Sequence, residues 1–314
     1  MDPRAIPLLQ DLSPQELQAI TRQLEPVALK AGDVLFAEGD LGDALYIVER
    51  GKLQIAKRVR TDSAETLPIL TVGPGGCVGE LALLDDAPRS STVQAVEATA
   101  LLRLSKDRFL SLIRSRSAIG AKLLLNLART VAPRIRQVNQ QLAVLFEVGR
   151  TLASGLEDVD RALSRTLQTL QQGLRADRAC LFFVNTIGES FDLRASVGRP
   201  VPALSMPLKR PAGTLSALPG ITTPQRLTAG ALKELSGSRE LQGWELESNL
   251  VLPITANSHP MAYLVLSRSQ PPFSDDDLNL AHSASLQMGQ FMERARLHQD
   301  LGHQDRIKRE YFRI

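Results

Sequence analysis

The chain has 314 residues, of which 43% are hydrophobic and 23% charged, a composition typical of soluble globular proteins and a length that favours two domains. The formal net charge is only +3, and the basic residues are spread along the chain, so a nucleic-acid partner is not expected although the sequence pI is near 9.0. Only Cys77 and Cys180 are present, which excludes a disulfide framework. With no signal peptide or membrane span in the opening residues, we expect a cytoplasmic protein without a metal site.

A helix followed by many short strands is predicted for the first third of the chain. Ser13, Pro14 and Glu16 form the pattern of a helix N-cap, first helical residue and capping box. From Pro26 to about Ser105, short apolar alternations are separated by turns rich in glycine and aspartate. Such spacing is typical of a β-sandwich, jelly roll or barrel.

The most informative segment spans residues 75–93. Gly79 and Glu80 lead into a short apolar run that predicts one or two helical turns, and the free N–H groups at such a start attract phosphate. Arg89 offers a fork of donors suited to a phosphate diester, and Ser90 adds a hydroxyl. Glu80 is then expected to accept hydrogen bonds from a sugar hydroxyl. The segment therefore predicts a site for a compact ribose phosphate, the alternative being a structural Glu80–Arg89 ion pair in a domain that has lost its ligand.

After Ser105 the apolar spacing becomes helical and stays so to about Leu174. One stripe advances in steps of three and four residues, which predicts a long helix with a seam between two subunits; its members are Leu124, Leu127, Val131, Ile135, Val138, Leu142, Leu145, Val148 and Leu152. The alternative is that this stripe covers the protein's own core. Pro133 removes one backbone donor, so we expect a kink there and a plausible hinge.

A second mixed region follows the long helix. Apolar runs at 179–184, 250–254 and 262–266 predict strands, and residues 196–248, rich in Pro, Gly, Ser and Thr, allow no detailed prediction. A last helix is expected to start at Ser274, a good N-cap before three aspartates that favour the positive end of the helix dipole, and to run into the tail.

The segment 75–93 resembles the phosphate-binding cassette of the cyclic nucleotide-binding domain family, and residues 32–48 resemble that family's early jelly-roll pattern. The resemblance covers roughly residues 12–140. By residue matching it implies that Glu80 binds the ribose 2′-hydroxyl and that Arg89 and Ser90 bind the cyclic phosphate. The remaining ligand-binding positions that it implies are Gly79, Leu81, Ala82, Ser91, Val138 and Asn139, the last two near the base on the long helix. Ser90 favours cyclic AMP over cyclic GMP.

Residues 143–297 resemble a GAF domain, through the strand runs described above and the segment from Phe273 to Leu278. The cyclic-nucleotide signature of some GAF domains is not found, so the resemblance implies a sensor of unnamed ligand. Cys180, inside a predicted apolar strand, is interpreted as a small buried residue rather than a chromophore attachment site. The four histidines are dispersed, which argues against a metal.

Together these features predict an α+β chain. We expect a β jelly roll over residues 1–116, a connecting and dimerisation helix over 117–150, a GAF α/β sandwich with an antiparallel sheet over 151–297, and a helical tail over 298–314. No Walker loop, nucleophile elbow, kinase signature or metal-binding carboxylate cluster is present, so no enzyme is predicted. The expected function is allosteric relay of a cyclic nucleotide signal by a homodimer to the GAF domain or an effector protein. A catabolite-activator-type transcriptional regulator and a ligand-free dimeric scaffold are the alternatives.

Overall fold

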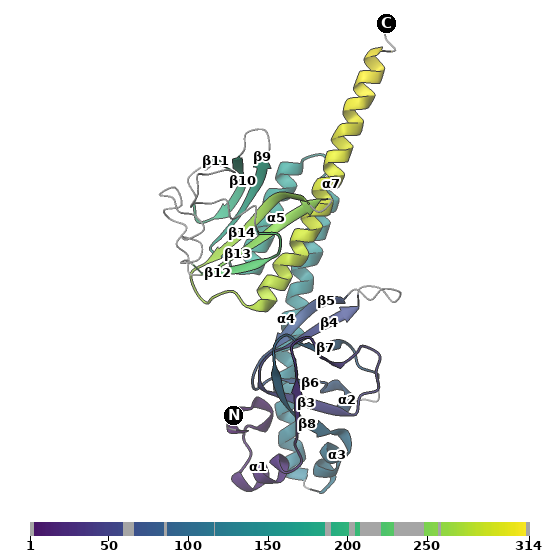
Figure 1. Cartoon of the computed structure of the whole chain (residues 1–314), viewed down its shortest axis with the longest axis vertical. Helices are drawn as coiled ribbons and strands as arrows, with labels where there is room; N and C mark the ends of the chain where they lie inside the picture. Colours follow the sequence, from purple (N-terminus) through teal and green to yellow (C-terminus); the bar gives the residue numbers. More distant parts are fainter. Residues whose placement is uncertain are drawn as a thin grey trace. The chain divides into compact units, whose positions relative to one another are not determined.

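A computed structural model describes residues 3–58, 66–84, 87–115, 117–185, 190–200, 205–207, 221–228, 248–256 and 259–311 (Figure 1). The chain forms two compact units, residues 1–139 and 140–314. The fold is α+β with antiparallel sheets and a long helix after the jelly roll, as predicted from the sequence.

The first unit opens with two short 3₁₀ helices, η1 (Pro3–Ala5) and η2 (Pro7–Leu9), and helix α1 (Pro14–Thr21). Ser13 caps α1 as predicted. Its Oγ accepts a hydrogen bond from the Glu16 N–H at 3.3 Å, and the Glu16 carboxylate accepts from the Ser13 N–H at 2.7 Å. This reciprocal pair satisfies two of the donors that a helix start leaves free.

Two four-stranded antiparallel sheets form the jelly roll of this unit. One has the order β1-β8-β3-β6 and the other β2-β7-β4-β5. Their bounds are β1 (Glu25–Leu29), β2 (Val34–Phe36), β3 (Ala44–Arg50), β4 (Leu53–Arg58), β5 (Thr66–Val72), β6 (Cys77–Val78), β7 (Thr92–Ala95) and β8 (Thr99–Ser105). The sheets enclose a core of mainly β-branched residues and leucines, which includes Val48, Leu53, Val93 and Leu101.

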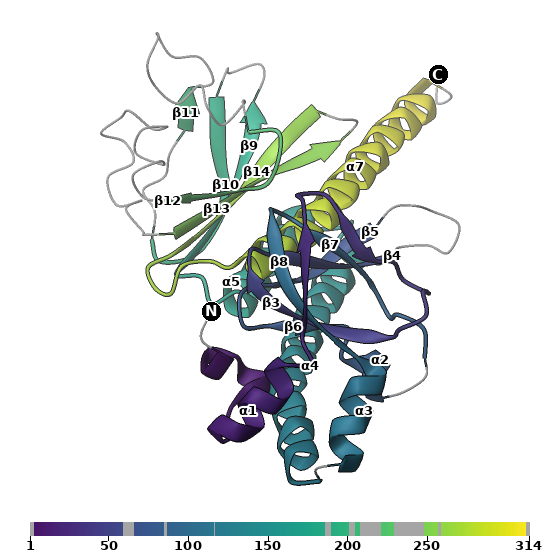
Figure 2. The same cartoon turned by 60° about the horizontal axis from the view of Figure 1, so that its bottom comes forward.

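Three further helices belong wholly or partly to this unit: α2 (Leu81–Leu84), α3 (Lys106–Ser115) and α4 (Ser117–Ala153). Figure 2 shows α1 and α3 on either side of the start of α4. Helices α1, α3 and α4 share one buried cluster, to which they contribute Ile20, Phe109 and Leu123 respectively. Helix α4 passes through Pro133 without ending, and the kink expected there stays a prediction.

The second unit contains the end of α4, helices α5 (Val159–Gly173) and α7 (Asp275–Tyr311), and one six-stranded antiparallel sheet. Its order is β11-β10-β9-β14-β13-β12, with bounds β9 (Arg178–Asn185), β10 (Ser190–Gly198), β11 (Ser205–Pro207), β12 (Gln225–Thr228), β13 (Ser248–Ala256) and β14 (His259–Arg268). Ser274 caps α7 as predicted, because its Oγ accepts from the Asp277 N–H at 3.1 Å.

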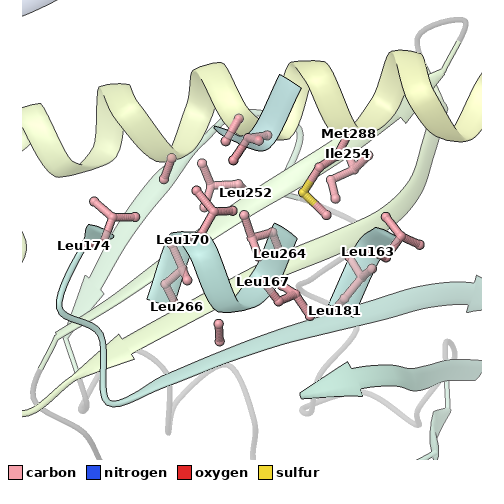
Figure 3. Packing of buried hydrophobic residues seen from close by; sticks show 14 of the residues in the cluster. Leu163, Leu167, Leu170, Leu174, Leu181, Leu252, Ile254, Leu264, Leu266 and Met288 are labelled. Carbon is pink, nitrogen blue, oxygen red and sulfur yellow. The ribbon is translucent and has the colours of Figure 1, made fainter. Parts of the chain in front are cut away.

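Helices pack on one face of this sheet. Figure 3 shows leucines of α5 and Met288 of α7 meeting alternate residues of the central strands, among them Leu252 and Leu264. Alternation along each strand therefore assigns one face to the helices. Cys180 lies on β9 and is completely buried, which confirms the interpretation of a small buried residue.

The nine-residue stripe predicted as an intersubunit seam does not lie on one face of α4. Leu127 is buried in the first core, and Val148 and Leu152 are buried in the second. In contrast, Ile135 and Leu142 are 55% and 58% exposed. The physical reason is that the two ends of the stripe pack in the separate cores of the two units, while Ile135 and Leu142 between them belong to neither core. The core interpretation is therefore confirmed for the buried residues, and the intersubunit seam stays a prediction for the exposed ones.

Candidate ligand-binding site

The cassette lies between β6 and β7 in the first unit. The chain leaves β6, turns at Gly79 with a φ of 77°, and forms the single helical turn α2 that the sequence predicts. Glycine is favoured at this turn by its positive φ and by close contacts, because a Cβ would lie 2.5 Å from Nη1 of Arg89 and 3.0 Å from the carbonyl oxygen of Ala44. The turn therefore brings the backbone into direct contact with the guanidinium of Arg89.

Arg89 is the buried cation of the site, only 5% exposed. Its Nη1 donates to the Gly79 carbonyl at 3.1 Å and its Nη2 to the Ala44 carbonyl at 2.9 Å. The guanidinium carbon stands 4.1 Å from the centre of the Phe36 ring, a cation–π distance. Its closest carboxylate is that of Asp43, 3.7 Å away and itself bound to Arg103 at 2.7 Å. Burial lowers the pKa of Arg89, and its buried Nε has no hydrogen-bond partner within the described residues.

Glu80 is the buried anion of the site, 9% exposed. The alternative of a direct Glu80–Arg89 ion pair is not what the structure shows. Glu80 instead pairs with Nη1 of Arg134, on α4, at 3.3 Å. The sequence analysis did not single out Arg134. Arg134 could have been found from the sequence, because it lies about one helical turn before Val138, on the same side of the helix.

A hollow of about 60 Å³ opens between these two charges. Six of the predicted residues line it: Gly79, Glu80, Leu81, Arg89, Ser90 and Ser91. Apolar residues that the sequence analysis missed complete its wall, namely Phe36, Ile55, Val78, Pro88 and Val93. Ala82 contributes backbone to α2, and its side chain lies outside the described residues. Val138 is half-buried and Asn139 exposed on α4, and neither lines the hollow.

The second unit has two larger hollows on its helices. One of about 690 Å³ lies between α4 and α5, over Val144 and Gly173, and is lined mostly by polar side chains. Another of about 420 Å³ is lined by Phe183, Met261 and residues of α7, with charged side chains around it. Burial raises the pKa of Cys180 to about 12, which keeps this thiol protonated and unreactive.

No group of three or more His, Cys, Asp or Glu side chains within the described ranges is placed to hold a metal ion. Among the same residues, no helix is both long and apolar enough to cross a lipid bilayer.

Comparison with known families gives two adjoining matches. The model of the cyclic nucleotide-binding domain matches residues 26–116, and the model of the GAF domain matches residues 158–291. These matches confirm the two resemblances seen in the sequence, in the same order along the chain.

Two curated relatives resemble the first part of the chain. The CRP-like cAMP-activated global transcriptional regulator of Mycobacterium tuberculosis (strain CDC 1551 / Oshkosh) is 36% identical over 139 residues, which are 44% of this chain and 59% of the relative. The cyclic AMP receptor protein of Thermus thermophilus is 34% identical over 169 residues, 54% of this chain and 71% of the relative. The chain thus spans less than two thirds of the mycobacterial relative's length.

Among solved structures, the crystal structure of the Thermus thermophilus catabolite activator protein is 34% identical. It covers 55% of this chain, which in turn covers 74% of it, with a TM-score of 0.40.

Proposed function

The chain belongs to the cyclic nucleotide-binding domain family and carries a GAF domain, and from this premise we propose that it is a cytoplasmic regulator that binds a cyclic nucleotide and relays the signal without catalysis. Cyclic AMP is proposed over cyclic GMP, on the basis of Ser90. The receiver of the signal is the GAF domain or a separate effector protein. Two buried free thiols support a reducing, cytoplasmic compartment.

The observation that carries this proposal is the pairing of charges around the small hollow. Arg89 and Glu80 are both buried there, yet Arg89 is held mainly by neutral carbonyls and Glu80 by Arg134. A buried cation is costly when its nearest counter-charge is shared, as the Asp43 carboxylate is between Arg89 at 3.7 Å and Arg103 at 2.7 Å. A cyclic phosphate bound to Arg89 would supply that charge, and a ribose hydroxyl would bind Glu80.

The remaining predicted residues take supporting roles in this proposal. The hydroxyls of Ser90 and Ser91 and the backbone N–H groups of Gly79, Leu81 and Ala82 surround the phosphate at the start of α2. Val138 and Asn139 face the base from α4. A hollow of about 60 Å³ is smaller than the few hundred Å³ typical of small-molecule sites, so binding is expected to move Arg134 and the cassette apart.

The relay is proposed to run along α4. Arg134 on this helix contacts the cassette residue Glu80 at 3.3 Å. The same helix continues without interruption to Ala153, and its residues Val148 and Leu152 are buried in the core of the second unit. A ligand that competes for Glu80 therefore acts on a helix whose far end belongs to the GAF core.

A homodimer is proposed from the exposed apolar residues of α4. Leu124, Ile135, Leu142 and Phe146 are 39%, 55%, 58% and 73% exposed. Large apolar side chains spaced along one helix in this way are typical of a helix-to-helix interface. Light scattering is expected to give twice the chain mass of 34.3 kDa.

Calorimetric titration with cyclic AMP and cyclic GMP tests the proposal. We expect micromolar binding of cyclic AMP and a loss on the order of 100-fold in Arg89→Leu, because two charge-assisted hydrogen bonds to phosphate disappear. Arg114→Leu is the matched control, since Arg114 is exposed in the last turn of α3. Circular dichroism checks that both variants fold. If the wild type binds neither nucleotide, the proposed function is wrong and the alternative of a ligand-free dimeric scaffold replaces it.

A transcriptional regulator is the second candidate, because the mycobacterial relative carries that description. In this chain the segment after the long helix matches the GAF model from residue 158, where a DNA-binding module would be needed. A gel-shift assay with genomic fragments, with and without nucleotide, decides between the two. Nucleotide-dependent retardation of specific fragments would favour the transcriptional regulator.

A further inference from the structure

Lys57, on β4, reaches across to the cassette. Its Nζ donates a hydrogen bond of 2.7 Å to the carbonyl oxygen of Ser90 and forms an ion pair of 2.8 Å with Oε1 of Glu38. Strand β4 lies beside β7 in one sheet, and the cassette leads directly into β7 (Figure 1). The ammonium thus joins a strand of the jelly roll to the loop that holds the predicted phosphate ligands.

The turn that contains Glu38 holds the same loop from the other side. The Gly39 N–H donates to the Arg89 carbonyl at 2.9 Å, and the Arg89 N–H donates to the Asp40 carbonyl at 2.8 Å. The Glu38 N–H donates to Oγ1 of Thr92 at 3.0 Å. Residues 89 and 92 are therefore fixed by this turn, while Ser90 between them is not bound by it.

Ser90 depends on Lys57 for its position. Within the described part of the chain, the bond from Lys57 is the one hydrogen bond that Ser90 makes. Ser90 is exposed and lies outside any strand or helix, so neither burial nor a ladder restrains it. Removing the ammonium therefore takes away the one hydrogen bond of Ser90 among the described residues.

The ion pair with Glu38 keeps the ammonium of Lys57 in place. Oε2 of Glu38 also accepts a hydrogen bond from the Arg58 N–H at 3.0 Å, so the carboxylate is fixed to the strand that carries Lys57. This backbone bond and Lys57 lower the pKa of Glu38, which keeps it ionised. The carboxylate therefore restricts the rotation of an otherwise half-exposed lysine.

The lysine also acts on the next peptide group. A cation bound to the Ser90 carbonyl polarises the peptide that joins Ser90 to Ser91, which makes the Ser91 N–H a stronger donor. Both serines line the hollow beside Arg89. The bond thus holds the main chain that carries the Ser90 hydroxyl and strengthens one donor, the Ser91 N–H, on the side of the hollow proposed for phosphate.

We propose that Lys57 is a positioning residue for cyclic nucleotide binding, which acts through the main chain of Ser90 rather than by contact with the ligand. This inference rests on the proposed function and adds to it a residue outside the cassette. This role explains why Lys57 forms a hydrogen bond to the Ser90 carbonyl in addition to its ion pair with Glu38.

Calorimetric titration with cyclic AMP of the full-length wild type, Lys57→Met, Lys57→Arg and Lys30→Met tests the proposal. We expect Lys57→Met to weaken binding roughly three- to ten-fold, the loss of one charge-assisted hydrogen bond. Lys57→Arg keeps a donor and is expected within about two-fold of wild type. Lys30→Met removes an exposed lysine just after β1 and is expected to have no effect.

Two readouts separate positioning from general electrostatic attraction or instability. In a Ser90→Ala background, Lys57→Met is expected to cost less than in the wild type, because the hydroxyl is gone and only the effect on the Ser91 N–H is left. The loss in Lys57→Met is also expected to persist in about 0.5 M salt, which screens long-range attraction. Three outcomes would each overturn the inference but leave the proposed function intact. They are wild-type affinity in Lys57→Met, strict additivity of Lys57→Met with Ser90→Ala, and a loss of affinity that disappears at high salt. A wild type that binds neither nucleotide overturns the proposed function and the inference with it.

Discussion

Replacing Gly79 with alanine should damage the site through a single added methyl group. The residue has a φ of 77°, which costs an L-residue about 1 kcal/mol. In addition, the new Cβ would lie 2.5 Å from Nη1 of Arg89, so the guanidinium must move and give up its 3.1 Å bond to the Gly79 carbonyl. A hydrogen bond from a charged donor adds about 2 kcal/mol. We expect a total destabilisation of about 3 kcal/mol.

Gly39→Ala is the matched control for this substitution. Gly39 has a φ of 95°, but nothing lies within 4 Å of the position of its Cβ. It should therefore cost only the backbone term of about 1 kcal/mol. Native-state hydrogen exchange of β3, read by mass spectrometry, reports the opening free energy of the first unit specifically. Equal destabilisation by the two substitutions would show that the contact with Arg89 is not the reason for glycine at residue 79.

Two further substitutions test the charges of the two units. Arg134→Gln leaves the Glu80 carboxylate without its ion-pair partner, so we expect the opening free energy of the first unit to fall by about 1–2 kcal/mol in the same hydrogen-exchange assay. A double mutant with Glu80→Gln should recover part of that loss, and strict additivity of the two substitutions would contradict the pairing. Burial lowers the pKa of His282 below its unfolded value of about 6.5, so the unfolded chain binds more protons as pH falls. The contribution of His282 to the stability of the second unit is therefore constant above about pH 6.5 and is lost below it. In His282→Asn the urea midpoint should vary less between about pH 7.5 and 5, and an unchanged pH dependence would contradict this assignment.

Local sequence patterns were sufficient to predict the elements around the site. The caps at Ser13 and Ser274 and the helical turn after Gly79 depend on residues a few positions apart, and each was confirmed. The cassette was recognisable because its ligands lie within one short segment. The last three residues of β10 and all of β11 and β12 fell in the stretch that allowed no prediction, because short strands with polar residues carry little periodicity.

Contacts between distant residues could not be predicted in the same way. Arg134 lies 54 residues from Glu80, and Lys57 lies 33 residues from Ser90. Neither has a neighbour in sequence that indicates its partner, since both act across elements that meet only in the folded unit. The stripe on α4 shows the same limit, because its spacing was correct while the surface that each residue meets changes along the helix.

The position of Arg134 gives α4 a specific role in the proposed signal. A helix that only covered the jelly roll would contact it through apolar residues, as Leu123 and Leu127 do. Arg134 instead places a cation on the carboxylate proposed to bind the sugar, so the ligand and the helix compete for one side chain. Under the proposed function, binding at Glu80 therefore acts on a contact of α4, whatever the GAF domain itself binds. If nucleotide binding proves independent of Arg134, the signal must leave the cassette by another route, and the helix would act as a passive connector.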